Sequence, residues 1–115
     1  MGFKVKEYLN YLFEMSNIRK SKTGLPVIIW AQNGVRLQHA PIIKISQNYG
    51  DKLDPTKLFS MAITDKLTTF GNTGEISKDT IKKVFLWVKK NKQNLLDYWN
   101  GTIDTETFLN NIKTL

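Results

Sequence analysis

The period of the hydrophobic positions changes along the chain and predicts helices at both ends with strands between them. Over residues 1–15, apolar side chains recur every three or four positions, the spacing of one helix face. Residues 26–31 are a continuous β-branched and aromatic run, typical of a strand. The pair Asn33-Gly34 then favours a two-residue hairpin turn. Residues 19–24 are polar and are expected to form an exposed connection.

Further strands are predicted in the middle of the chain. Residues 35–46 alternate between apolar and polar side chains, as a strand with one solvated face does. Pro41 interrupts this pattern; because proline has no N–H to donate, it marks a bulge, an edge or the start of a new strand. Residues 58–64 form another short apolar run, and a fourth strand is expected around residues 67–70.

A long amphipathic helix is predicted over residues 78–99, because its apolar side chains follow a period of 3.6 residues. Ser77 can cap its first turn and Gly101 can end it. A short helix follows, with Asp104 as its cap. At 115 residues the chain has the length of one domain. We therefore predict a single basic α+β domain over residues 1–115, with an N-terminal helix, a small, mainly antiparallel sheet of three to four strands, a long C-terminal amphipathic helix and a short terminal helix.

Charge adds the strongest functional signal. The chain has 17 Lys and Arg against 10 Asp and Glu, a net charge of +7. Two regions carry much of the excess, since residues 15–50 contain no acidic residue and residues 78–92 are rich in lysine. Lysines neutralise phosphates, so we expect a non-enzymatic binding module whose partner is RNA, DNA or an acidic protein. The alternative is that the charge serves only solubility. The residues expected to contact an anionic partner are Arg36, Lys44, Lys82, Lys83, Lys89 and Lys90.

Several kinds of chemistry are poorly supported by the composition. There is no cysteine, so disulfides, thiol nucleophiles and Cys-ligated metals are excluded. One histidine and scattered acidic residues show no metal-ligand spacing, and no phosphate-cradling glycine motif is present; we expect no metal and no cofactor. No apolar run has the length of a membrane span, and the start of the chain does not resemble a signal peptide. A cytoplasmic protein is expected.

Two alternatives to a binding module remain open. A toxin-like endoribonuclease would use Lys or Arg to bind phosphate and His39 or Tyr49 for proton transfer. A protein-interaction or dimerisation domain would be favoured if Leu86, Trp87 and Tyr98 formed an exposed apolar patch. Base stacking would need exposed aromatic side chains near the basic residues. The candidates for stacking are Trp30, Tyr49 and Trp87.

The helix and the turn before it also carry a family resemblance. The residues concerned are Asn72-Thr73-Gly74-Glu75-Ile76, then Ile81, Val84, Leu86 and Trp87, and finally Asn94-Leu95-Leu96-Asp97-Tyr98-Trp99. Over residues 41–100 the chain resembles the domain-of-unknown-function 4160 family of small bacterial proteins. The family's strand carries Pro-His-Phe-His-Val where this chain has Ile42 and Lys44 at the histidine positions. The resemblance implies a small α+β domain of bacteria or their mobile elements, suggests a link to toxin-antitoxin-like operons, and implies no established activity.

Overall fold

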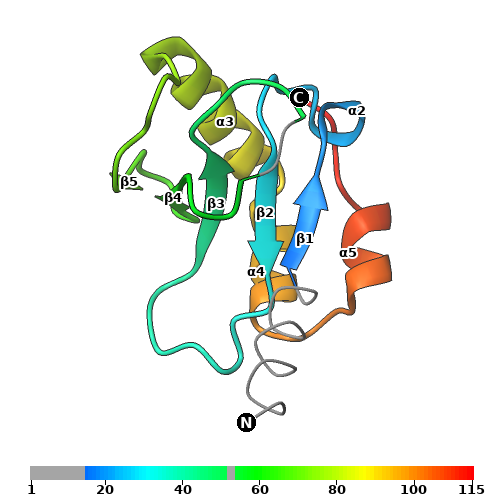
Figure 1. Cartoon of the computed structure of the whole chain (residues 1–115). Coiled ribbons are helices and arrows are strands. Elements are labelled where there is room, and N and C mark those ends of the chain that lie inside the picture. The colour runs from blue at the N-terminus through cyan, green and yellow to red at the C-terminus, as the bar shows by residue number, and fades with distance from the viewer. Residues whose placement is uncertain (1–14, 52–53) are drawn as a thin grey trace, which may run out of the picture.

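The computed structural model describes residues 15–51 and 54–115 (Figure 1). The described strands are β1 (Met15–Ile18), β2 (Ile29–Gln32), β3 (Ile42–Ser46), β4 (Leu58–Ala62) and β5 (Thr69–Phe70). The described helices are α2 (Lys20–Thr23), α3 (Lys78–Lys90), α4 (Lys92–Trp99) and α5 (Thr105–Asn110). The strands pair antiparallel in the order β1-β2-β3-β4-β5, so each strand neighbours the next one along the chain.

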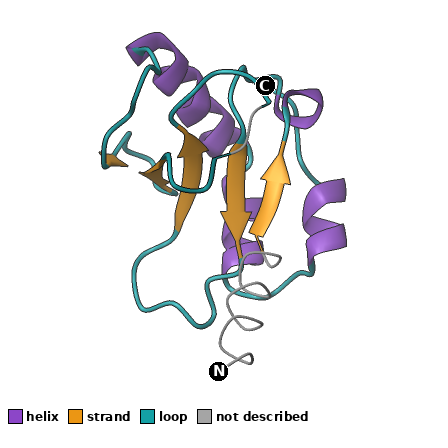
Figure 2. Cartoon of the chain, viewed as in Figure 1, coloured by secondary structure: helices purple, strands orange, loops and turns teal. Residues whose placement is uncertain are grey.

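The two faces of the sheet differ because successive side chains of a strand point to opposite faces. Ile43 and Ile45 of β3 are completely buried in the core, and Lys44 between them projects from the other face. Helices α3 and α4 lie behind the strands in the view of Figure 2, on the core side, and α5 lies beside β1. The helices contribute these buried side chains to the core: Val84, Trp87, Val88, Leu95, Tyr98 and Phe108.

The fold class is α+β, but the predicted layout is wrong. The sheet has five strands rather than three to four, because β1 begins at Met15, the last residue of the predicted helix, and continues over residues 16–18, where no strand was predicted. Ile18 of β1 pairs with Ile29 and is fully buried, so packing against the sheet outweighs the polar residues around it. The rest of the helix predicted over residues 1–15 lies outside the described residues. The polar connection over residues 19–24 contains the short helix α2, which ends at Gly24 with φ of 75°.

The long helix predicted over residues 78–99 is two helices, α3 and α4, which meet at Asn91. The Asn91 side chain, only 3% exposed, donates from Nδ2 to the carbonyl oxygens of Trp87 and Lys113, both at 3.0 Å. Its Oδ1 accepts from the backbone N–H of Lys113 at 2.8 Å. An asparagine that bonds to nearby backbone groups competes with the helix, and here it also fastens the C-terminal residues to the core.

The two-residue turn predicted at Asn33-Gly34 is wrong: β2 and β3 do pair antiparallel, but a longer loop over residues 33–41 joins them. The backbone N–H of Gly34 donates to the carbonyl oxygen of Trp99 at 2.7 Å. A Cβ atom at position 34 would overlap the Trp99 indole ring. Glycine is therefore required here for close approach to the end of α4, and not for a tight turn.

Candidate nucleic-acid interface

The outer face of α3 gathers four of the six basic residues predicted to contact an anionic partner. Because Val84, Trp87 and Val88 are buried in the core, the opposite side of the helix is exposed to solvent. At its centre is Leu86, which is 54% exposed. Three or four residues before and after Leu86, the spacing of neighbours on a helix surface, stand exposed lysines. We call these residues the lysine face: Lys82, Lys83, Lys89 and Lys90.

The lysine face has no carboxylate partner among the residues that the structure describes. Ion pairs in these residues join Arg19 to Asp51 at 3.8 Å and Lys92 to Asp65 at 2.9 Å. The hydrogen bond from Lys92, followed by the charge of Lys92, lowers the pKa of Asp65. Within the face, Lys90 Nζ donates to a backbone carbonyl at 2.7 Å, and a second lysine lies 5.7 Å from the centroid of an aromatic ring. Asp79, in the first turn of α3, is the one acidic residue near the face on this helix, so the face keeps a net positive charge.

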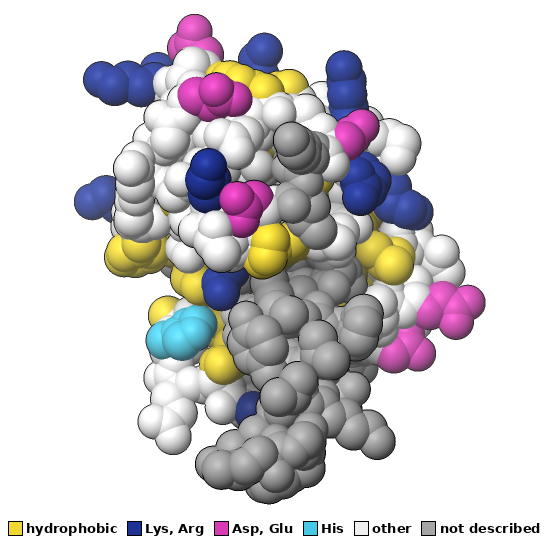
Figure 3. Space-filling model, in the orientation of Figure 1, with side chains coloured by type: hydrophobic (Ala, Val, Ile, Leu, Met, Phe, Trp, Pro, Cys, Tyr) yellow, Lys and Arg dark blue, Asp and Glu magenta, His cyan; other side chains and the backbone are white. Residues whose placement is uncertain are grey.

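The C-terminal residues bring a second basic segment to the end of the lysine face. Thr114 Oγ1 donates to the carbonyl oxygen of Lys22 in α2 at 2.9 Å, and the carbonyl oxygen of Thr114 accepts from Lys90 Nζ. Figure 3 shows Lys and Arg side chains around the upper rim of the molecule, where α2 and the start of α3 lie. Sequence reasoning did not select Lys22 for the site, and no sequence signal joins residues so far apart.

The other two predicted contact residues lie elsewhere. Lys44 projects from the sheet face that α3 does not cover, as the alternation along β3 requires. Arg36 is exposed in the loop over residues 33–41, which packs against the end of α4 through Gly34. The basic residues of segments 15–50 and 78–92 therefore do not all share one surface.

The two residues considered for proton transfer are far apart. His39 precedes β3 and Tyr49 follows it, so they lie at opposite ends of the same strand. The exposed His39 ring is tilted against Trp99, with ring centroids 5.4 Å apart, and its Nδ1 lies 3.0 Å from the carbonyl oxygen of Ala40. One reaction centre cannot use both side chains.

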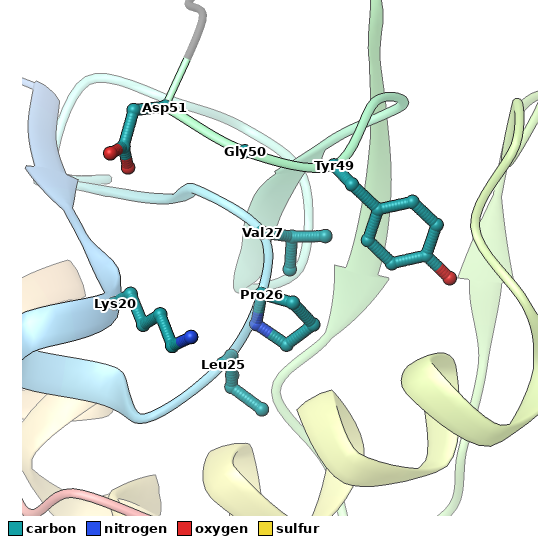
Figure 4. Close-up of a pocket in the computed structure, with 7 residues that line it drawn as sticks. All are labelled: Lys20, Leu25, Pro26, Val27, Tyr49, Gly50 and Asp51. Carbon is teal, nitrogen blue, oxygen red and sulfur yellow. The ribbon is translucent and has the colours of Figure 1, made fainter.

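The Tyr49 hydroxyl is engaged at the start of α3. It accepts from the backbone N–H of Ser77 at 3.0 Å and lies 3.1 Å from Thr80 Oγ1. The side-chain hydrogen bond with Ser77, followed by that with Thr80, lowers the pKa of Tyr49. Tyr49, Lys20 and Pro26 are among the residues that line a hollow of about 210 Å³. In Figure 4 the Tyr49 hydroxyl points away from Lys20 and Pro26. This arrangement supports the N-terminus of α3, where Ser77 is the cap, as predicted.

Most of the aromatic side chains considered for stacking or docking are buried. Trp30 is 6% exposed, and Trp87 and Tyr98 are fully inside the core, so the patch predicted from Leu86, Trp87 and Tyr98 does not exist. Tyr98 instead stacks on an α5 ring to join α4 to α5. The most exposed aromatic side chain among the described residues is Phe70, at 54%. Sequence reasoning missed it as a site residue, because a phenylalanine in a short apolar run is typical of a core strand.

Comparisons with known proteins add no function. No helix in the described ranges 15–51 and 54–115 has the length and apolar character needed to cross a bilayer. The same residues contain no group of three or more His, Asp or Glu side chains that could hold a metal ion. Comparison with family models, curated proteins and solved structures gave no match. The resemblance to the domain-of-unknown-function 4160 family therefore stays a prediction.

Proposed function

We propose that the chain is a non-enzymatic nucleic-acid-binding module that contacts backbone phosphates through the lysine face of α3. The observation that carries this proposal is a set of four exposed lysines on one helix face, with no carboxylate partner among the described residues. A lysine that neutralises a phosphate releases a condensed counterion, which gives affinity without sequence preference. A cytoplasmic location belongs to the same proposal.

The spacing of the lysines suits a phosphate backbone. Lys82 and Lys89 are seven residues apart, as are Lys83 and Lys90, a separation of about 10 Å along the helix axis. That length equals about three base-pair steps of a duplex at 3.4 Å each. The face thus presents two parallel rows of two lysine residues. Packing of the opposite side of α3 against the core holds the two rows in place.

The arrangement of the candidate catalytic groups argues against an endoribonuclease. Cleavage would require acid and base groups that converge on one phosphate. The predicted enzyme would use His39 or Tyr49 beside a lysine or arginine. The Tyr49 hydroxyl is already hydrogen-bonded at the start of α3, and the His39 ring packs against Trp99 in the loop before β3. Binding without cleavage is therefore the stronger proposal.

A second candidate partner, an acidic protein, is favoured by Leu86. This exposed side chain lies at the centre of the lysine face, and protein interfaces commonly combine an apolar centre with a polar rim. The substitution Leu86→Gln separates the two partners. It should weaken docking of a protein and leave the affinity for nucleic acid unchanged, since Leu86 carries no charge for a phosphate.

The test of the proposal is the fluorescence anisotropy of labelled single-stranded RNA, duplex RNA and duplex DNA mixed with the protein. Each is measured at low and near-physiological salt, and a gel of each mixture reports cleavage. Binding that weakens steeply with salt and leaves the nucleic acid intact would support the proposal. No binding at low salt would refute it. Cleaved RNA would also contradict it and would direct attention to His39.

A further inference from the structure

On the side of the sheet away from α3, a row of side chains crosses four strands. The strand register pairs Trp30 with Lys44, Lys44 with Ser60, and Ser60 with Phe70. Side chains of residues paired across neighbouring strands point to the same face. The row therefore lies on the face opposite Ile43 and the rest of the core.

The row is covered at one end and open at the other. Trp30 on β2 is buried, Lys44 and Ser60 are partly exposed, and Phe70 on β5 is more than half exposed. Figure 3 looks onto this side of the sheet, and hydrophobic side chains are visible over its left part, where β4 and β5 lie. We call the accessible part of the row the open strip: Lys44, Ser60 and Phe70.

The open strip combines an aromatic ring with two polar side chains. The Lys44 ammonium and the Ser60 hydroxyl have no hydrogen-bond partner among the described residues. The strands β3, β4 and β5 contain no acidic residue, so nothing within them compensates the charge of Lys44. Neighbouring strands lie about 4.8 Å apart, which places the Cα atoms of Lys44 and Phe70 about 10 Å apart on one surface.

We propose that the open strip binds an unpaired nucleotide of a single-stranded nucleic acid, with the base stacked on Phe70 and an adjacent phosphate contacted by Lys44. Every base has a flat face that can stack on an aromatic ring, and a sheet surface that carries such rings is a common platform for single strands. A lysine side chain can reach across the neighbouring strand toward the backbone of a nucleotide held there. Ser60, between the two, can hydrogen-bond to the sugar or the base edge.

This site is separate from the lysine face, because the two lie on opposite sides of the sheet. It adds a preference that phosphate contacts alone do not give, since a duplex keeps its bases stacked inside and offers none to Phe70. The lysine face alone would bind a duplex at least as well as a single strand. Both sites together would favour unpaired nucleic acid.

The experiment compares two labelled probes, a single-stranded RNA hexamer and an abasic hexamer that has the same sugar-phosphate backbone. The wild-type protein should bind the RNA hexamer more tightly. Loss of one stacking contact in Phe70→Leu should weaken that binding by about 5- to 150-fold and leave the binding of the abasic probe unchanged. Phe70→Tyr keeps the ring and should retain the preference. Lys44→Gln should weaken the binding of both probes and reduce the salt slope by about 0.7.

Thermal melting of each variant checks that the exposed substitutions leave the fold intact. Equal binding of the two probes by the wild-type protein would overturn the proposal, as would unchanged RNA affinity in Phe70→Leu. Backbone amide shifts upon addition of the RNA hexamer should appear in β3, β4 and β5. Shifts confined to α3 would overturn the open strip and leave the lysine face supported. If the hexamer results are as expected but the protein does not bind a duplex, the lysine face is refuted and the open strip remains supported.

Discussion

Removal of two charges from the lysine face should change how the affinity for a duplex depends on salt. The variant Lys82→Gln/Lys83→Gln removes two exposed lysines that form no ion pair with the described residues. Its matched control is Lys57→Gln/Lys66→Gln, which removes two exposed lysines that lie outside α3. Each double variant lowers the net charge by two, so only the position of the lost charge differs.

The magnitude follows from the number of phosphates contacted. For duplex DNA, the logarithm of the affinity falls with the logarithm of the salt concentration by about 0.9 for each phosphate neutralised. Four contacts give a slope of about −3.6, so a rise from about 50 to 200 mM salt should weaken binding about 150-fold. With two contacts the slope is about −1.8, and the same rise should weaken binding only about 12-fold.

The assay is fluorescence anisotropy with a labelled DNA duplex over a series of salt concentrations. The α3 variant should show the smaller slope and the control pair the wild-type slope. Equal reductions of the salt slope in both double variants would show that net charge, and not the lysine face, drives binding. A wild-type slope in the α3 variant would refute the face as the contact site. Circular dichroism of each variant confirms that the fold is retained.

Three further predictions concern the fold that carries these sites. Asn91→Asp replaces the buried amide donor that bonds to Lys113 with a carboxylate, and should lower the free energy of unfolding by about 1–3 kcal/mol in urea titrations. Gly34→Ala places a methyl group against the Trp99 ring and should cost about 1–3 kcal/mol, read from thermal melting; an unchanged melting temperature would contradict this packing. The backbone hydrogen bond from Thr107 at the first turn of α5 lowers the pKa of Asp104 below 3.8. The ionised carboxylate therefore stabilises the folded protein fully above pH 3.8, and this contribution is lost as the pH falls through the lowered pKa of the folded state. Asp104→Asn should show no such loss in acid unfolding curves compared with the wild type.

Features set by neighbouring residues were predicted well from the sequence. Ser77 caps α3 and Asp104 caps α5, because a capping side chain bonds to the N–H of a residue only three positions further on. The strand β4 lies within the apolar run over residues 58–64. Strand β3 begins directly after Pro41, one of the three outcomes that the sequence allowed.

Features set by distant residues were not predicted. The break at Asn91 depends on Lys113, and the path of the loop at Gly34 depends on Trp99. The local pattern predicted an uninterrupted helix through Asn91 and a tight turn at Gly34, and both predictions were wrong. The partner that decides the conformation lies elsewhere in the chain, so hydrophobic periodicity carries no information about it. The strand β1 was missed for the same reason, since its burial requires the paired β2.

Of the two candidate sites, one follows from the local sequence pattern and the other depends on the pairing of distant residues. Helical periodicity alone places Lys82, Lys83, Lys89 and Lys90 away from the core, so the lysine face could be inferred before the structure. Alternation along β3 places Lys44 on the opposite face from Ile43 and Ile45, but it does not indicate which of the two faces the helices cover. The row from Lys44 to Phe70 depends on the register of three strands, which short apolar runs do not specify.

The net charge of +7 includes lysines of both proposed binding surfaces, and the value of the charge alone does not distinguish the two surfaces. The lysine face offers only ammonium groups and one leucine, so its affinity for nucleic acid must be almost wholly salt-dependent. The open strip has one lysine beside an exposed ring, so a larger share of its affinity must come from stacking, which salt screens little. Single strands should thus retain more of their affinity at high salt than duplexes do, and this difference should disappear in Phe70→Leu.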